Sequence, residues 1–232
     1  MASRNKLQKF ADNLGFPNVF ENFDPRTNIL IGPDGAKTEI NSGWNNFYFA
    51  NNNPITLELA CGRGEYSIAL AQMYPDSNFI GVDVKGARIW KGARYAIGKN
   101  ITNLAFLRTR IENIESFFLA QEVSEIWITF PDPFLKNSKS NRRLTSLTFL
   151  NKYNNLLKPG GTIHLKTDSP ELYEFTLETL GSQDNYDVQY FNDDIYSSPL
   201  IFPELEIKTY YENQHLSEGR KIKYIRFLVK SE

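Results

Sequence analysis

The sequence predicts an α/β protein with a Rossmann-like, mostly parallel, doubly wound sheet that a late antiparallel strand closes. Two observations predict this fold. From residue 55 onward, short apolar runs alternate with helix-like stretches of roughly 10 to 15 residues, which is the pattern of βαβ units. Near the end of the chain the alternation changes, because two strand-like runs there flank one helix-like segment.

The strands are predicted from short runs rich in apolar and β-branched residues. They are residues 55–60, 78–84, 104–110, 125–133, 162–168, 186–196 and 221–230. The predicted helices are residues 65–75, 87–100, 111–120, 144–157, 170–181 and 204–216. Pro170 suits a first helical position, and the Lys-Pro-Gly-Gly of residues 158–161 is predicted to be a turn that ends the preceding helix.

The Asn-rich stretch at residues 45–54 reads as a loop that leads into this fold. We therefore predict an N-terminal extension at residues 1–54 and one domain at residues 55–232. The extension is either loosely packed, or it folds over a ligand site or contacts a partner.

Composition excludes several classes of protein. The 26 Lys and Arg residues balance 27 Asp and Glu residues, which argues against non-specific coating of nucleic acid but permits a local basic patch. No apolar run is long enough for a membrane span, and the N-terminus lacks the apolar segment of a signal peptide, so we expect a cytoplasmic protein. With one cysteine and two histidines, neither a disulfide nor a His/Cys metal site is expected.

A glycine-rich turn after the first predicted strand indicates a nucleotide-type cofactor site. The turn contains Gly62 and Gly64, which allow the backbone to bend sharply and approach a ligand at a helix N-terminus. Asp83, about 20 residues further at the end of the second strand, is placed to accept hydrogen bonds from a ribose diol. The pattern predicts a cofactor that contains adenosine.

The acid before this turn distinguishes between two such cofactors. A dinucleotide fingerprint would carry a third glycine, which is missing here. Glu58 would repel a pyrophosphate but would attract the ammonium group of S-adenosylmethionine. The turn therefore favours S-adenosylmethionine over NAD(H).

Residues 130–144 hold an acid rigidly beside a group of cations. Asp132 lies between two prolines, which fix their own φ angles and restrict the residue before them. The cations that follow are Lys136, Lys139, Arg142 and Arg143. Arginine and lysine side chains of this kind grip phosphates, so the stretch predicts a fixed carboxylate next to an RNA-binding arm.

With these segments together, the sequence resembles the bacterial tRNA (guanine-N7)-methyltransferase family over roughly residues 55–225. The resemblance is carried by LELACGRG, FIGVDVKGARI, FPDPFLKNSKSNRRLTSLTFLNKY, LKPGGTIHLKTDSPELYEF and KTYYENQHLSEG. The first two segments are shared by many methyltransferases that use S-adenosylmethionine. The acid between prolines and the late Thr-x-Tyr-Glu element are more specific to this family.

The resemblance implies a class I methyltransferase that transfers a methyl group from S-adenosylmethionine to N7 of a guanosine in tRNA, at position 46 in the variable loop. It implies that Asp132 is catalytic and also faces the cofactor. The other cofactor-binding residues it implies are Glu58, Gly62, Gly64 and Asp83. The implied substrate-binding residues are Lys136, Asp168, Thr209, Tyr210, Tyr211 and Glu212, and Arg142 and Arg143 would contact the tRNA backbone.

The sequence departs from the family pattern at two informative positions. Phe134 stands where the family usually has tryptophan, and it can still stack or pack. Arg110 stands where an acid usually lies near the adenine, so we include Arg110 among the cofactor-binding residues. The alternatives at this place are the backbone near Ile111 or the side chains of Glu112 and Asn113.

Two other functions remain open at this point. A methyltransferase of a small molecule or a protein would need an apolar pocket and would have no use for the arginine pair. A non-catalytic RNA-binding module could retain the fold, although the intact Glu58, Asp83, Asp132 and Asp168 argue against lost catalysis.

Overall fold

A computed structural model describes residues 5–230, and the chain divides into two compact units with the boundary between residues 119 and 120. The first unit contains a sheet in the order β3-β2-β1-β6-β5-β4. Its strands are β1 (Val19–Glu21), β2 (Leu30–Ile31), β3 (Lys37–Thr38), β4 (Ile55–Leu59), β5 (Asn78–Asp83) and β6 (Leu104–Arg108). The strands β1, β6, β5 and β4 are parallel, and β2 and β3 add an antiparallel edge.

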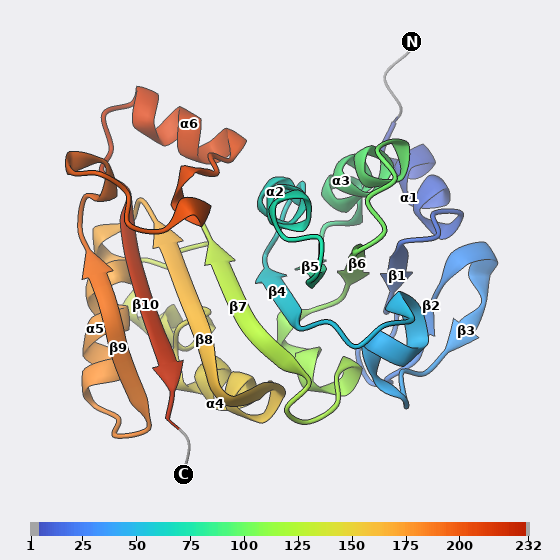
Figure 1. Cartoon of the computed structure of the whole chain (residues 1–232), viewed down its shortest axis with the longest axis horizontal. Helices are drawn as coiled ribbons and strands as arrows, with labels where there is room; N and C mark the ends of the chain where they lie inside the picture. Colours follow the sequence, from blue (N-terminus) through green and yellow to red (C-terminus); the bar gives the residue numbers. More distant parts are fainter. Residues whose placement is uncertain (1–4, 231–232) are drawn as a thin grey trace. The chain divides into compact units, whose positions relative to one another are not determined.

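Helices cover this first sheet. They are α1 (Lys6–Leu14), α2 (Glu65–Met73) and α3 (Gly86–Gly98), with short helical turns η1 (Pro33–Gly35), η2 (Asn45–Phe49) and η3 (Ile111–Phe117). The helices α2 and α3 contact β5 and β6, and α1 packs against α3 (Figure 1). Every residue of β4 and β5 is buried, including the polar Glu58 and Asp83, as expected for central strands of a parallel sheet that is covered on both faces.

The described part of the N-terminal segment is packed into the first unit. The strand β1 pairs with β6 in parallel, and its Glu21 is buried between Arg108, at 3.3 Å, and Asn13, which donates at 3.2 Å. The Trp44 Nε1 donates to the carbonyl of Phe117 at 2.8 Å. These contacts tie residues 5–54 to the first sheet, whereas a separate domain at residues 55–232 stays a prediction.

The second unit has a sheet in the order β7-β8-β10-β9. The strands are β7 (Val123–Thr129), β8 (Leu157–Thr167), β9 (Tyr186–Asn192) and β10 (Lys223–Val229). The strand β7 runs parallel to β8, and β10 is antiparallel to both β8 and β9. This confirms the predicted late antiparallel strand.

The helices of the second unit are α4 (Leu147–Leu156), α5 (Pro170–Gly181) and α6 (Tyr210–Ser217), with η4 (Asn137–Arg142), η5 (Ile195–Ser197) and η6 (Pro203–Glu206). The helix α5 lies behind β9 and β10, and α6 lies beyond the end toward which the arrow of β8 points (Figure 1). In parallel strands, loops at this carboxyl end form the ligand-binding edge of a doubly wound sheet.

Several predicted elements differ from the structure. The predicted loop at residues 45–54 contains η2, and the predicted strand 186–196 ends at Asn192. Residues 158–161, predicted to be a turn, lie within β8, where they bulge out of the ladder because Val123 pairs with Leu157 but Glu125 pairs with Thr162. The predicted helix 204–216 breaks into η6 and α6. The predicted helix 111–120 is a 3₁₀ helix that ends at residue 117. Within residues 5–230, none of the helices has the length and apolar character needed to cross a membrane.

Candidate functional site

The loop after β4 has an unusual backbone. Ala60, Gly62 and Gly64 all have positive φ angles, of 59°, 57° and 66°. A left-handed conformation is disfavoured for alanine, and such strain concentrates at ligand-binding sites. A Cβ placed on Gly62 would approach only the Ala60 carbonyl, at 4.0 Å, so the backbone there is open to a ligand. The geometry fits the predicted cofactor turn.

Two buried carboxylates fix this loop. Asp83, at the end of β5, accepts hydrogen bonds from the backbone N–H of Gly62 at 2.9 Å and of Lys85 at 2.7 Å. Glu58 accepts from the backbone N–H of Ser67 at 2.8 Å and from the Ser67 hydroxyl, in the first turn of α2. Both acids therefore shape the cofactor loop, and their contacts with a ribose or an ammonium group stay predictions.

The carboxyl end of β6 presents a polar group that the sequence did not single out. The Thr109 side chain is buried, and its hydroxyl has no hydrogen-bond partner among residues 5–230. A buried polar atom without a partner is rare and suggests an absent ligand. Arg110 next to it is exposed, and Asn113 already donates to the Pro25 carbonyl at 2.7 Å. Thr109 thus joins Arg110 as a candidate for adenine recognition.

The single cysteine of the loop is chemically quiet. Burial raises the pKa of the Cys61 thiol well above its ordinary value, and the carboxylates of Glu58 and Asp83 raise it further. A neutral buried thiol is a poor nucleophile. Among residues 5–230 there is also no cluster of three or more His, Cys, Asp or Glu side chains that could hold a metal ion.

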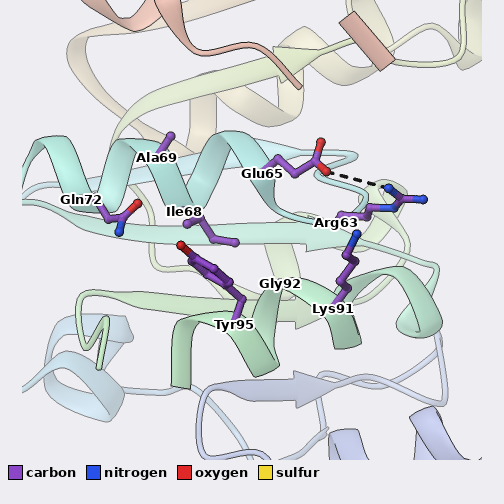
Figure 2. A pocket seen from close by; sticks show the side chains of 8 residues that line it. All are labelled: Arg63, Glu65, Ile68, Ala69, Gln72, Lys91, Gly92 and Tyr95. Carbon is purple, nitrogen blue, oxygen red and sulfur yellow. Dashed lines mark ion pairs between the residues drawn. The ribbon is translucent and has the colours of Figure 1, made fainter. Parts of the chain in front are cut away.

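A groove of about 380 Å³ lies between α2 and α3. Figure 2 shows Arg63 and Lys91 at one end of the groove, and Arg63 forms an ion pair with Glu65 at 4.0 Å. The apolar end of the groove is formed by Ile68, Ala69 and the Tyr95 ring. None of the predicted site residues lines this groove, and we assign it no part in the chemistry.

The stretch with the acid between prolines is strained at both ends. It directly follows β7, and Phe130 and Phe134 have positive φ angles of 49° and 42°. The Phe130 backbone N–H donates to the Lys166 carbonyl of β8 at 2.8 Å. Asp132 itself is exposed, and its Oδ1 accepts from the Phe134 N–H at 3.3 Å. The backbone holds a solvent-facing carboxylate at the carboxyl end of β7.

Arg143 has a different place from the one predicted for it. Its side chain is buried, and its guanidinium donates to the carbonyls of Pro133 at 3.0 Å and Phe134 at 3.2 Å. The same group lies 4.4 Å from the centre of the Phe175 ring. This burial leaves little of the guanidinium open to a phosphate, so we reassign Arg143 as the brace of the Asp132 loop. A cation in a basic run reads as a surface residue, and no local pattern signals this role.

Arg142 and Lys136 do lie on the surface of the second unit. Both side chains are exposed at the ends of η4, and the Arg142 guanidinium lies 4.9 Å from the centre of the Phe134 ring. They remain candidates for contact with the tRNA backbone and with the substrate, respectively.

The two neighbouring arginines should respond differently to substitution. Arg142→Ala is expected to raise the KM for tRNA and to weaken the salt dependence of KM, because phosphate contacts release counterions. The melting temperature should change little, because the Arg142 side chain is exposed. Arg143→Ala is expected to lower the stability by about 2 to 4 kcal/mol, because two carbonyls and an aromatic face lose their partner. Thermal unfolding and KM at two salt concentrations measure both effects. Equal melting temperatures for the two variants would contradict this assignment.

A second cavity, of about 500 Å³, lies wholly in the second unit. It is lined by Pro133, Leu135, Asp168, Ser169, Pro170, Glu171, Arg220, Lys221 and Lys223. It therefore brings the Asp132 loop and the predicted substrate residue Asp168 together. Asp168 follows β8, and it pairs with Arg220 at 2.7 Å and lies 3.6 Å from the His215 Nε2. Arg220 and His215 were not predicted, since nothing in the sequence links them to a residue so distant along the chain.

The Thr-x-Tyr-Glu element starts α6. Thr209 caps the helix, accepting from the Glu212 N–H at 3.1 Å. Tyr210 and Tyr211 are largely exposed, and their rings meet edge to face at 5.5 Å. Glu212 is fully buried, and its Oε2 has no hydrogen-bond partner among the described residues. The element thus offers two surface rings and one buried carboxylate.

Comparison with known proteins identifies the family. A family model described as "Putative methyltransferase" matches residues 52–225. A tRNA (guanine-N(7)-)-methyltransferase of Bacteroides thetaiotaomicron is 46% identical over 99% of this chain and 87% of its own length. A protein of the same name from Christiangramia forsetii is 46% identical over 99% of this chain and 100% of its own.

Solved structures support the same fold at low sequence identity. The 16S rRNA methyltransferase KamB superposes with a TM-score of 0.61 at 14% identity, over 84% of this chain and 97% of its own. This likeness shows a Rossmann-like methyltransferase fold. With the matched family model and the two relatives, it leads to one assignment: the chain belongs to the tRNA (guanine-N7)-methyltransferase family.

Proposed function

We propose that this protein transfers a methyl group from S-adenosylmethionine to N7 of a guanosine in tRNA, at position 46 of the variable loop, in the cytoplasm. The observation that carries the proposal is the match of almost the whole chain to relatives named tRNA (guanine-N(7)-)-methyltransferase. The strained loop that presents Asp132 is consistent with this function. Position 46 follows from the family resemblance of the sequence.

The reaction needs placement more than proton transfer. Guanine N7 already carries an exposed lone pair, and S-adenosylmethionine supplies an electrophilic methyl group on a sulfonium. No base has to remove a proton before the bond forms. Holding the two reacting atoms in line can provide much of the rate enhancement, because it removes the entropy cost of their encounter.

The first unit provides the donor-binding residues. We propose that the Asp83 carboxylate accepts hydrogen bonds from the ribose hydroxyls of S-adenosylmethionine, and that this methyl donor lies against the open backbone at Gly62. Glu58 is assigned to the ammonium group, and Thr109 with Arg110 to the adenine. The buried Thr109 hydroxyl and the open face of Gly62 are the two features of the described residues that fit such a ligand.

Asp132 is the proposed catalytic residue. Methyl transfer moves positive charge onto the purine ring, and a carboxylate fixed near that ring stabilises the developing charge. Alternatively its oxygens accept from the guanine N–H edge, which orients N7. Both roles need a carboxylate with a fixed position. The loop that carries Asp132 is restricted by its two prolines, by the left-handed backbone of Phe130 and Phe134, and by the buried Arg143.

The second unit provides the tRNA-binding residues. We propose that Arg142 contacts phosphates and that Lys136, Asp168 and the element Thr209–Glu212 surround the guanosine. Tyr210 and Tyr211 expose aromatic rings on which an unstacked base can stack. Phosphate contacts hold the tRNA without reading its sequence, so the base pocket must choose the nucleotide. A base buried in the folded tRNA must leave its stack to enter the pocket.

The direct test uses unmodified tRNA transcripts, the purified protein and labelled S-adenosylmethionine. We expect 7-methylguanosine in the nucleoside digest by mass spectrometry, and borohydride-aniline cleavage at nucleotide 46. A transcript with adenosine at that position is the matched control and should take up no label.

Other outcomes separate the remaining functions. Donor binding by titration calorimetry without any methylated nucleoside would indicate a methyltransferase of another substrate. Tight tRNA binding without donor binding would indicate a non-catalytic RNA-binding module. Methylation at a different guanosine would retain the activity and reject position 46.

A further inference from the structure

Lys166 is a buried lysine whose ammonium group makes three polar contacts to one segment of the chain. It lies near the end of β8 and has no exposed surface. Its Nζ donates to the carbonyls of Leu205 at 3.1 Å and Ile207 at 2.9 Å, and to the Glu212 carboxylate at 2.8 Å. An ammonium group has three protons to donate, and these three acceptors all lie within residues 205–212.

Lys166 and Tyr196 hold Glu212 in its place. The carboxylate has no exposed surface, and its Oε1 also accepts from the Tyr196 hydroxyl at 2.7 Å. Its Oε2 is buried and has no partner among residues 5–230. Removing one partner of a buried ion pair leaves an uncompensated charge, and Lys166 is the cation paired with this carboxylate. One oxygen is therefore clamped by two donors, and the other is left as an acceptor.

The Lys166 backbone reaches the catalytic loop as well. Its carbonyl accepts from the N–H of Phe130, the residue where the acid-between-prolines stretch begins. The side chain of the same residue fixes the start of α6, which carries the Thr-x-Tyr-Glu element. Lys166 thus contacts the Asp132 loop through its backbone carbonyl and the predicted guanosine-binding element through its side chain.

We propose that Lys166 is a positioning residue of the methyl transfer, which holds the Glu212 carboxylate so that its free oxygen accepts from the guanine N–H edge, with Tyr196 as the second clamp. The inference rests on the proposed function. Burial lowers the pKa of Lys166, while the Glu212 charge opposes that shift. Burial also raises the pKa of Tyr196, and its hydrogen bond to Glu212 adds to the rise, so the hydroxyl keeps its proton.

The test is a double-mutant cycle on kcat/KM for tRNA with Lys166→Met, Glu212→Gln and the double variant. Lys166→Met is expected to lower kcat/KM about 30-fold or more, as when one partner of a buried charge pair is removed. The loss should fall on kcat, because phosphate contacts dominate tRNA affinity. The double variant should be no slower than Glu212→Gln alone, since the two residues act as one unit.

Controls separate positioning from a loss of folding. The kcat values are referred to the number of donor-binding sites counted by titration calorimetry, so an unfolded fraction does not enter. Lys158→Met removes an exposed lysine of the same strand and should leave kcat/KM unchanged. If Lys166→Met does not fold, Tyr196→Phe tests the same carboxylate and should lower kcat/KM about 5- to 10-fold without a change in donor binding.

Additive effects in the cycle, or a kcat/KM that neither Lys166→Met nor Tyr196→Phe changes, would overturn the inference. Failure of the proposed function itself looks different. In that case the unaltered protein forms no 7-methylguanosine, whatever the variants do.

Discussion

Replacing Asp132 with alanine should lower kcat for tRNA methylation about 100-fold or more, the size of effect seen when one preorganised electrostatic group is removed. The carboxylate is exposed and makes one weak hydrogen bond, to the Phe134 N–H at 3.3 Å, so little folding energy depends on it. The melting temperature should therefore change little, and donor binding should stay partly intact, because the family resemblance also places Asp132 beside the cofactor. Initial rates at saturating tRNA, thermal unfolding and calorimetric titration with S-adenosylmethionine measure the three quantities.

Asp132→Asn refines this prediction. The amide keeps the shape and the acceptor oxygen but loses the charge. If charge stabilisation dominates, the asparagine variant should be as slow as the alanine variant. If the group acts as a hydrogen-bond acceptor, the asparagine variant should keep an intermediate rate. Asp184→Asn, an exposed acid of the same unit, is the matched control. A fully active Asp132→Ala protein would remove Asp132 from the mechanism.

The sequence was sufficient for the parts of the site that depend on local pattern. The positive φ angles at Gly62 and Gly64, and the place of Asp132 between a strand end and a basic run, are properties of a few adjacent residues. Contacts between residues that are distant in the sequence could not be predicted from such local patterns. Arg143 reads as a surface cation, yet it turns inward because the strained loop presents two carbonyls that need donors. The pair of Lys166 and Glu212 joins residues that no periodic pattern connects.

The fold shows the same division. The strands β4, β5 and β6 were predictable because each is a short apolar run. The strand β1 is not predictable from the sequence because it has only three residues and one of them, Glu21, is charged. Glu21 can be buried there because Asn13 and Arg108, the latter distant in the sequence, contact its carboxylate. Residues 158–161 read as a turn because proline and glycine dominate them, but a bulge accommodates them inside β8.

Gly64→Ala is expected to be strongly destabilising to the first unit. A Cβ at this position would lie 2.4 Å from Cε1 of Phe106, and the residue has a φ of 66°. The clash and the left-handed backbone together should cost about 2 to 4 kcal/mol. This corresponds to a fall in melting temperature of about 5 to 15 °C for a chain of this size. Donor affinity should fall with it, since the loop that carries Gly62 must shift.

Gly64 is sensitive to substitution because glycines surround the Phe106 ring. Cβ atoms on Gly81 and Gly92 would also come within 3.0 Å of Phe106, so the ring occupies a slot formed by the loop, β5 and α3. These glycines therefore set the spacing between helix and sheet. In a Phe106→Leu background, Gly64→Ala should cost less than in the parent, because part of the clash is gone. Gly98→Ala, where a Cβ meets nothing within 4 Å, should leave the melting temperature unchanged or raise it. An equal loss of stability at Gly98 and Gly64 would show that the slot around Phe106 does not determine the loop.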